Sequence, residues 1–416
     1  MIRPIFGGLL LALMPLALFA ADWPQFRGPD RTDVSKESGL LKTWPKDGPK
    51  LLWTFENAGI GFSGPAIVGD RLFTIGTRDD AEYVFAIDVK TGKELWATKG
   101  GSPYTNAWGD GPRSTPTVDG DVLFALGANG DLLCLETATG KKRWQVSLVT
   151  QLGGTVPSWG YSEAPLVDGD RVVCTPGGAK GCLAALDKKT GKVIWQSMDC
   201  KDGTAYSSIM MANVGGVRQY VQMTEQGVVG VAAKDGALLW RSELGQNDTA
   251  IVPTPIVEGD LVYVTSGYGA GGGVLKLTAD KGAVKAGQIW ANRSLVNHHG
   301  GVLKVGEHVY GFADGTGWVC QEFKTGKRVW DGRGKLGKGS LTCADGRLYL
   351  YAENDGACVL IDASPAGWTE TGRFTIPRET KLDRKSGQIW THPVVANGRL
   401  YLRDQDLLFC FDVKAK

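Results

Sequence analysis

The sequence predicts an all-β protein, an eight-bladed β-propeller built from tryptophan-docking repeats. An N-terminal strand is expected to pair in the last blade and so close the ring. Two observations lead to this prediction: a short motif that recurs along the chain, and the spacing of the aromatic residue that ends it. The motif stands at residues 86–96 (AIDVKTGKELW), 134–144 (CLETATGKKRW) and 185–195 (ALDKKTGKVIW), with looser copies elsewhere. Its aromatic anchors lie 40 to 51 residues apart, the length of a four-stranded blade. These anchors are Trp53, Trp96, Trp144, Trp195, Trp240, Trp290, Trp330 and Phe374.

The two ends of the chain are expected to share the last blade. The last apolar strand, residues 408–412, stops before its anchor, whereas Trp53 ends a strand pattern near the N-terminus. Pairing these two segments supplies the missing outer strand. It also removes exposed strand edges, because a closed ring pairs strands that would otherwise be open to other chains.

Each part of the motif has a structural reason. The Thr-Gly step predicts a tight turn, in which a preceding Asp accepts backbone hydrogen bonds and glycine adopts a positive φ. Asp-Gly or Glu-Gly between apolar runs, as at residues 119–120 and 258–259, predicts the inner hairpin of a blade. A tryptophan is large enough to fill the space between neighbouring blades. We therefore expect the anchors to be packing residues and not catalytic ones.

The motif and its preceding hairpin together resemble the PQQ-like propeller repeat, named after pyrroloquinoline quinone. The family with this repeat includes quinoprotein alcohol dehydrogenases and BamB-like outer-membrane assembly factors. The resemblance covers about residues 50–413, and residues 22–29 (DWPQFRGP) resemble a leader found in secreted members. It implies the propeller fold, whereas function depends on the residues placed on that fold.

The chain divides into three parts. Residues 1–21 have the features of a signal peptide: a basic Arg3, an apolar run and small residues at the end. The alternative is that this segment is not cleaved and serves as a membrane anchor. Residues 22–49, rich in proline and charge, are expected to form an irregular arm on the propeller, which occupies residues 50–416. No later apolar run is long enough to span a membrane. The mature protein is therefore expected in the periplasm or outside the cell.

Composition restricts the partners. The 46 Lys and Arg residues nearly balance 44 Asp and Glu residues, so the chain lacks the basic surplus of a nucleic-acid-binding protein. We expect a monomer that binds an envelope protein or a small molecule. The eight cysteines include no CxxC pair. Cys174 with Cys182, and Cys343 with Cys358, could form disulfides, or the cysteines could remain buried thiols.

Candidate site residues lie in the long loops that connect the outer strand of one blade to the inner strand of the next. These loops open on one face of a propeller, so their aromatic, charged and histidine side chains converge at the central mouth. Three of the four histidines fall in such loops. The candidate ligand-binding residues are Tyr104, Trp108, Asp110, Arg113, Trp159, Tyr161, Glu163, Asn297, His298, Lys338 and His392. The alternative is that these side chains only cap the channel.

Two functions are compatible with these residues. The resemblance implies that a PQQ enzyme would hold calcium through oxygen ligands, which Glu163, Asn297 and Asp110 could supply. Its other requirements would be met by a cation (Arg113 or Lys338) and a flat ring (Trp159 or Tyr161). However, the adjacent cysteine pair of alcohol-oxidising members and a CxxCH haem motif are absent from the sequence. The leading hypothesis is therefore a binding scaffold of the assembly-factor type. A PQQ- and calcium-dependent alcohol or sugar dehydrogenase is the alternative.

Overall fold

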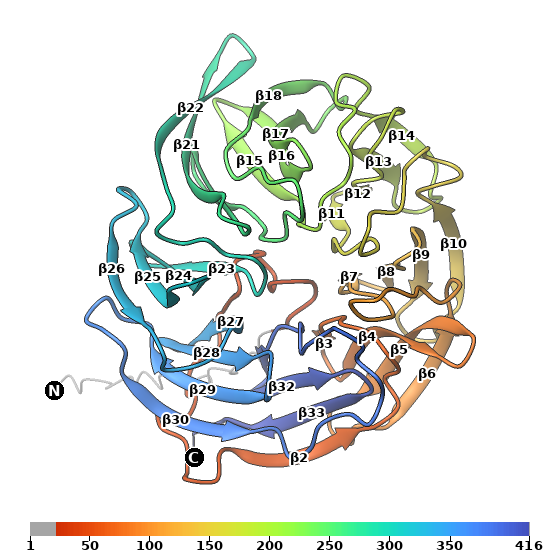
Figure 1. Cartoon of the computed structure of the whole chain (residues 1–416). Coiled ribbons are helices and arrows are strands. Elements are labelled where there is room, and N and C mark those ends of the chain that lie inside the picture. Colours follow the sequence, from red (N-terminus) through yellow and green to blue (C-terminus); the bar gives the residue numbers. More distant parts are fainter. Residues whose placement is uncertain (1–21, 416) are drawn as a thin grey trace, which may run out of the picture.

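The protein is an eight-bladed propeller, as predicted, with its eight sheets arranged in a ring around a central axis (Figure 1). The computed structural model describes residues 22–415, and the predicted signal peptide, residues 1–21, lies outside the described residues. The regular secondary structure of the described residues consists of β-strands alone, with no helix among them. A helix long and apolar enough to cross a membrane does not occur in that part of the chain.

Blades 1 to 4 follow one another along the chain. Blade 1 comprises β3 (Ala66–Val68), β4 (Arg71–Arg78), β5 (Ala81–Asp88) and β6 (Glu94–Lys99). Blade 2 comprises β7 (Thr117–Asp119), β8 (Val122–Leu126), β9 (Asp131–Glu136) and β10 (Lys142–Ser147). Blade 3 comprises β11 (Leu166–Asp168), β12 (Arg171–Cys174), β13 (Ala184–Asp187) and β14 (Val193–Gln196). Blade 4 comprises β15 (Met210–Val214), β16 (Val217–Thr224), β17 (Gly227–Ala232) and β18 (Leu238–Ser242).

Blades 5 to 7 continue the ring. Blade 5 comprises β19 (Ile256–Glu258), β20 (Leu261–Ser266), β21 (Gly271–Asp280) and β22 (Ala283–Asn292). Blade 6 comprises β23 (Val302–Val305), β24 (His308–Ala313), β25 (Gly317–Glu322) and β26 (Arg328–Gly332). Blade 7 comprises β27 (Gly339–Ala344), β28 (Arg347–Ala352), β29 (Ala357–Asp362) and β30 (Glu370–Thr375). A short strand of the arm, β1 (Val34–Ser35), pairs in parallel with β27.

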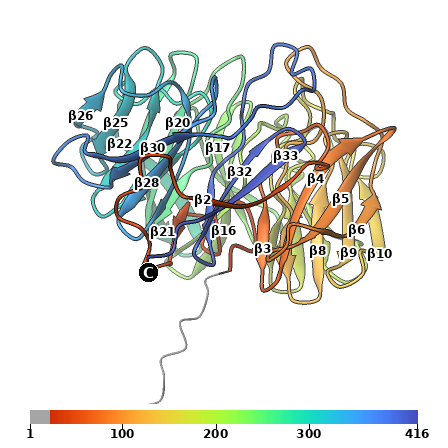
Figure 2. The ribbon, with the colours of Figure 1, turned by 90° about the horizontal axis from the view of Figure 1, so that it is seen from below.

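Blade 8 joins the two ends of the chain. It comprises β31 (Val394–Ala396), β32 (Arg399–Asp404), β33 (Leu407–Asp412) and the N-terminal β2 (Lys50–Phe55). β2 pairs antiparallel with β33, with Trp53 opposite Cys410. In the edge-on view, β2 lies beside β33 (Figure 2). This pairing confirms the predicted closure.

The aromatic anchors join each blade to the next. Trp53 donates its Nε1–H to the carbonyl of Val89 in blade 1 at 2.8 Å, and its ring lies against Gly92 in the Thr-Gly turn. Equivalent bonds join blades further round the ring: Trp96 to Thr137, Trp144 to Lys188, Trp290 to Phe323 and Trp330 to Ser364. The motif glycine therefore has two roles, a positive φ in the turn and a surface on which the neighbouring tryptophan packs.

Trp195 packs on Gly236 of the next blade in the same way, but its Nε1 has no hydrogen-bond partner among the described residues. Two other anchors depart further from this arrangement. Trp240 donates to Gln219 within its own blade, because the next blade has a long β21–β22 hairpin where blades 1, 2, 3 and 6 have a Thr-Gly turn. Phe374 packs against Trp44 of the arm, with ring centroids 5.2 Å apart. The arm residue Gly48 lies against Phe374 as Gly92 lies against Trp53.

A pair of glycine substitutions separates the two roles of the motif glycine. Gly69 and Gly92 both have positive φ, but nothing lies near the position of a Gly69 Cβ, whereas a Gly92 Cβ would be 2.6 Å from Trp53. Gly69→Ala is expected to cost about 1 kcal/mol for its backbone conformation. Gly92→Ala is expected to cost about 1–3 kcal/mol more, because the tryptophan must shift. Urea unfolding checks this, and equal losses would show that the close approach is unimportant.

The disulfide prediction is wrong in its pairing. The bond joins Cys182 to Cys200, whereas Cys174, Cys343 and Cys358 are buried free thiols. Cys174 faces the core shared with blade 2, and Cys182 faces the core shared with blade 4. Cys343 and Cys358 likewise face opposite sides of blade 7. Each expected pair is therefore separated by its own sheet.

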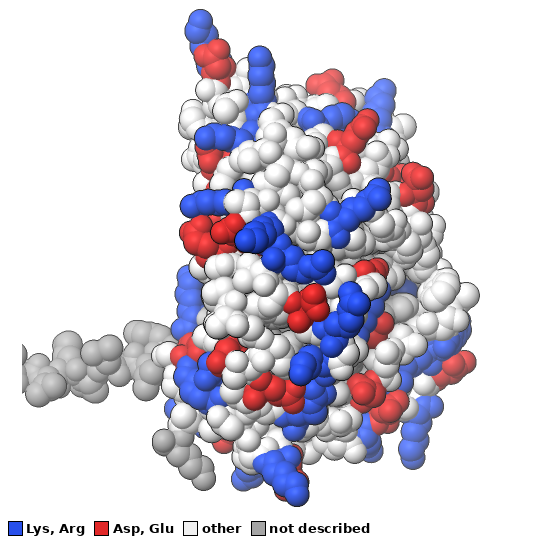
Figure 3. Space-filling view, turned by 60° about the vertical axis from the view of Figure 1, so that its left-hand side comes forward, with Lys and Arg blue, Asp and Glu red and all other residues white. Residues whose placement is uncertain are grey.

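Surface charge follows the near balance of the composition. On the side of the ring that carries β22 and β26, Lys and Arg side chains are interspersed with Asp and Glu (Figure 3). That side has no extended surface of one sign.

Candidate functional site

A cavity of about 490 Å³ lies at the centre of the ring, within the size range of small-molecule sites. Its walls come from the loops that connect one blade to the next. The aromatic residues that line it are Phe26, Phe62, Trp108, Trp159, Tyr206, Tyr268 and Trp390. The basic residues that line it are Arg27, Arg113, His298, His299 and His392.

The N-terminal arm forms the floor of this cavity. It crosses the centre of the ring as the orange-red segment in Figure 1. Arg27 is buried, forms an ion pair with Asp33 at 3.1 Å and donates to the carbonyls of Thr254 and Val302. Arg31 is also buried and donates to three other carbonyls near the inner strands, those of Ala164, Pro165 and Ile209. The arm therefore fills the channel and is held by the backbone of successive blades.

Arg113 provides a positive charge in the aromatic wall. Its guanidinium donates to the carbonyls of Gly109 and Gly111 at 2.8 and 2.7 Å and lies over the rings of Phe62 and Tyr104. Burial lowers the pKa of Arg113 to about 10, so it remains a cation at neutral pH. No carboxylate of residues 22–415 forms an ion pair with it, which leaves this charge available to an anionic ligand.

A chain of four polar side chains begins in the cavity wall with Tyr268 and His298 and continues to Lys338 and Asp314. The Tyr268 hydroxyl is 2.8 Å from His298 Nε2, and Lys338 Nζ is 2.7 Å from His298 Nδ1 and 2.9 Å from Asp314. Burial, together with the nearby Lys338 and His299, lowers the pKa of His298 to about 4. A lysine ammonium can only donate, so the neutral ring carries its proton on Nε2 and donates to Tyr268.

His299 belongs to a second network beside the first. Its Nε2 contacts the carboxylate of Glu353, which also accepts a 3.0 Å hydrogen bond from Trp390 Nε1. Burial lowers the pKa of His299 and outweighs the effect of Glu353. Burial opposes ionisation of Glu353, but the hydrogen bond from His299 and the adjacent cations prevail and lower its pKa. The pair is therefore a neutral imidazole that donates to a carboxylate.

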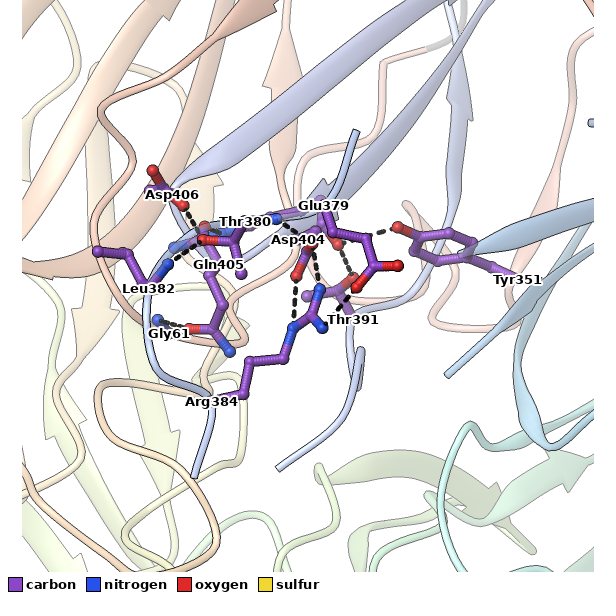
Figure 4. Close-up of polar contacts among 11 residues, drawn as sticks. Gly61, Tyr351, Glu379, Thr380, Leu382, Arg384, Thr391, Asp404, Gln405 and Asp406 are labelled. Carbon is purple, nitrogen blue, oxygen red and sulfur yellow. Dashed lines mark hydrogen bonds and ion pairs between the residues drawn. The ribbon is translucent and has the colours of Figure 1, made fainter. Parts of the chain in front are cut away.

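One long loop, residues 376–393, carries Trp390 and His392 into the cavity wall. Figure 4 shows how Arg384 reaches the buried carboxylate of Asp404 at the β32–β33 turn, while the Thr380 amide donates to the same carboxylate at 2.8 Å. On the other side, Lys385 pairs with Asp110 at 2.7 Å. The loop is thus tied to blade 8 and to the loop after blade 1.

The structure brings part of the predicted set together. Five predicted residues line the cavity: Trp108, Arg113, Trp159, His298 and His392. Tyr104 and Lys338 contact two of these, through the ring of Tyr104 under Arg113 and the ammonium of Lys338 on His298. Asp110 is paired with Lys385 and does not line the cavity.

The other three predicted residues lie away from the cavity wall. Tyr161 packs in the core between blades 2 and 3, and its hydroxyl donates to the carbonyl of Pro176. Glu163 is buried and accepts from the Thr175 amide and hydroxyl and from Gln222. Asn297 is buried, and its amide donates to the carbonyl of Phe312.

Sequence reasoning did not select several residues of the cavity. Phe26 and Arg27 were assigned to an arm lying on the propeller, and only their place in the channel reveals them. Phe62 and Tyr206 lie in loops, 56–65 and 197–209, from which no candidate was selected. Tyr268 had a usable signal, since an aromatic residue between two glycines at a hairpin tip is unlike a packing residue. His299 was not selected, although it directly follows the candidate His298 in the sequence.

A calcium-bound PQQ does not fit the residues present. Among residues 22–415 no three His, Cys, Asp or Glu side chains are grouped so as to hold a metal ion. The oxygens of Glu163 accept hydrogen bonds from neighbours, and Asp110 is neutralised by Lys385. Asn297 keeps one buried oxygen without a partner, but it does not line the cavity. The described residues therefore do not form a site for PQQ with calcium.

Comparison with known proteins agrees with the fold. A family model described as outer membrane protein assembly factor BamB matches residues 80–332, more than half of the chain. The chain belongs to this family. A polyvinylalcohol dehydrogenase of a Sphingopyxis species is 28% identical over 161 residues, which are 35% of this chain and 24% of that relative. A BamB from Shewanella oneidensis is 22% identical over 222 residues, 53% of this chain and 52% of that relative.

These two relatives are named for different functions, so similarity alone does not assign one to this chain. This chain spans about half or less of the length of these two relatives. Among solved structures, the quinohemoprotein alcohol dehydrogenase ADHIIG from Pseudomonas putida HK5 matches with a TM-score of 0.53 at 10% identity. That match covers 95% of this chain and 81% of the other, and it supports the fold alone.

Proposed function

We propose that this protein is a binding propeller that acts outside the cytoplasm as a monomer and takes a small, partly apolar anion into its central cavity. The observation that carries the proposal is Arg113, a cation without an ion-pair partner in the described chain, in a wall of aromatic rings. Aromatic surface favours a flat apolar body, and a guanidinium favours a carboxylate. The arm supports the same proposal because it closes the channel beneath the ligand.

A carboxylate and its neutral analogue test this proposal. Benzoate is expected to bind and benzamide to bind at least about 10-fold more weakly, because only benzoate forms a charge-assisted pair with Arg113. Arg113→Met is expected to weaken benzoate binding by about 10- to 100-fold. Isothermal titration calorimetry measures both, with the exposed Arg333→Met as the matched control. Equal affinities of the native protein for benzoate and benzamide would contradict the proposal that the cavity selects an anionic ligand.

A polypeptide partner in the cell envelope is part of the same proposal. The family description and the name of the Shewanella relative both refer to outer membrane protein assembly, which supports a protein partner. Cross-linking in intact cells of the native host, followed by purification of the tagged protein, tests it. Recovery of no envelope protein above an untagged control would argue against a scaffold role.

The second candidate is a quinone-dependent oxidoreductase. It is favoured by the relatives, which include the quinone-dependent dehydrogenase subunit of Komagataeibacter europaeus at 29% identity over 185 residues. Incubation with PQQ and calcium, followed by gel filtration and absorbance, tests it. Since the described residues do not form a calcium site, we expect no retained cofactor and no dye-linked alcohol oxidation.

A further inference from the structure

Two adjacent histidines line the cavity in different hydrogen-bonding states. The ring centroids of His298 and His299 are 5.2 Å apart, and both rings line the cavity. His298 connects to Tyr268 and Lys338, whereas His299 connects to Glu353. One network therefore ends in a hydroxyl at the cavity and the other in an imidazole.

His299 is arranged as a base. Its Nε2 faces the Glu353 carboxylate, which can only accept, so Nε2 carries the proton and Nδ1 holds a free lone pair. Nδ1 forms no hydrogen bond with any residue in 22–415. A carboxylate that orients an imidazole in this way also stabilises the imidazolium that forms when the ring accepts a proton.

Tyr268 is arranged as a hydrogen-bond donor. His298 donates to the Tyr268 oxygen, so the hydroxyl hydrogen is directed away from His298. The residue has a φ of 53°, in the left-handed region that bulky side chains rarely adopt, and its ring packs edge-on against His298 with centroids 4.7 Å apart. Backbone strain of this kind is frequent at ligand sites.

We propose that the cavity catalyses enolisation of an aromatic 2-oxo acid, with His299 as the base and Tyr268 as the donor to the carbonyl oxygen. The proposal rests on the proposed function, because Arg113 holds the carboxylate and the aromatic wall holds the ring. His299 Nδ1 removes a proton from the carbon next to the carbonyl group. The C–H bond breaks, an N–H bond forms, and the electron pair makes an enolate whose oxygen is stabilised by Tyr268.

The proton then returns from His299 to the carbon or to the enolate oxygen. Return to carbon restores the ketone, and return to oxygen gives the enol. The atoms and electrons balance without an oxidant, a reductant or a second substrate. His299 and Tyr268 are the catalytic residues, whereas Glu353, His298 and Lys338 are positioning residues.

Phenylpyruvate in deuterium oxide is the test. Proton NMR follows the loss of the signal at the carbon next to the carbonyl, and wild-type protein is expected to accelerate exchange about 100-fold or more over buffer. His299→Gln is expected to return exchange to the buffer rate. Tyr268→Phe is expected to slow it by about 10- to 100-fold. Both variants should bind phenylpyruvate within about 3-fold of wild type, since Arg113 and most of the aromatic wall remain.

The matched control is His308→Gln. His308 begins β24 and does not line the cavity, so this variant should keep the wild-type exchange rate. Thermal unfolding of each variant verifies that it folds. Glu353→Gln should lower kcat with little change in KM. Because Glu353 raises the pKa of His299, its neutralisation should also move the acidic limb of the rate profile to lower pH.

Each contrary outcome overturns a defined part of this inference. Binding of phenylpyruvate without exchange above buffer overturns the catalysis and leaves the binding function intact. Wild-type exchange in His299→Gln overturns the assignment of the base. Absence of phenylpyruvate binding, when benzoate binds, overturns the substrate class. Failure of benzoate as well as phenylpyruvate overturns the proposed function itself.

Discussion

Replacement of Arg403 by methionine is expected to lower the free energy of unfolding by at least about 4 kcal/mol. Arg403 lies on β32 of blade 8, and its side chain is completely buried. It donates to the carbonyls of Ser63 and Ile75 and to the Thr74 hydroxyl, at 2.7 to 2.9 Å, across the seam to blade 1. Methionine fills much of the same volume but leaves these acceptors buried and unpaired.

The location of Arg403 makes this expectation specific to ring closure. Further bonds reach the carbonyls of Ala58 and Gly59, on the segment that leads from β2 into blade 1. Urea unfolding followed by tryptophan fluorescence measures the loss. Arg373→Met is the control, because that side chain is 42% exposed and pairs with Glu370 on the surface. A loss no larger than that of the control, which should be within about 0.5 kcal/mol, would contradict this account of the seam.

Replacement of Arg27 by methionine is expected to destabilise the protein by about 3–5 kcal/mol. The side chains of Arg27 and Asp33 are each only 2% exposed, so the substitution removes the guanidinium from a buried carboxylate. The remaining basic group near that carboxylate is His392, with Nδ1 at 3.6 Å. The carbonyls of Thr254 and Val302 also lose their donor. Because Arg27 forms part of the cavity floor, benzoate affinity should fall together with stability.

Two further variants define the origin of that loss. Lys36→Met removes an ion pair of the same arm whose side chains are 67% and 54% exposed, and it should change stability by less than about 0.5 kcal/mol. Arg27→Met combined with Asp33→Asn should be more stable than Arg27→Met alone, since no unpaired charge remains buried. If the double variant is no more stable, the buried charge is not the source of the loss.

The sequence predicted the blades well because the relevant interactions are local. In the motif at Asp88, the carboxylate accepts from the Thr91 amide and hydroxyl, each at 2.7 Å, and the glycine follows directly. These contacts span four residues, so the turn can be predicted from the letters alone. The position of Trp53 in blade 8 could be predicted by matching the two ends of the chain. The last strand, residues 408–412, has no aromatic anchor after it, and Trp53 is an anchor with no motif before it.

The candidate site was predicted only in part, and the three buried candidates show why. Tyr161, Glu163 and Asn297 belong to the same loops as Trp159 and His298, but their side chains point into the protein. Loop backbone has no regular period, so residue number does not indicate the direction of a side chain. The pairing of Cys182 with Cys200 was missed for a related reason, since the residue at 200 lies in a loop.

The sequence by itself determined that this chain forms a closed ring of eight blades with aromatic anchors, since each anchor and turn repeats at the period of one blade. Only the tertiary structure decided that the arm passes through the channel and becomes the floor of the cavity. Arg27 and Arg31 bind backbone carbonyls of distant blades, and a carbonyl group is present at every residue. No side-chain pattern encodes such partners, so the cavity, and the meeting of Arg113, Tyr268 and His299 around it, depends on the folded ring.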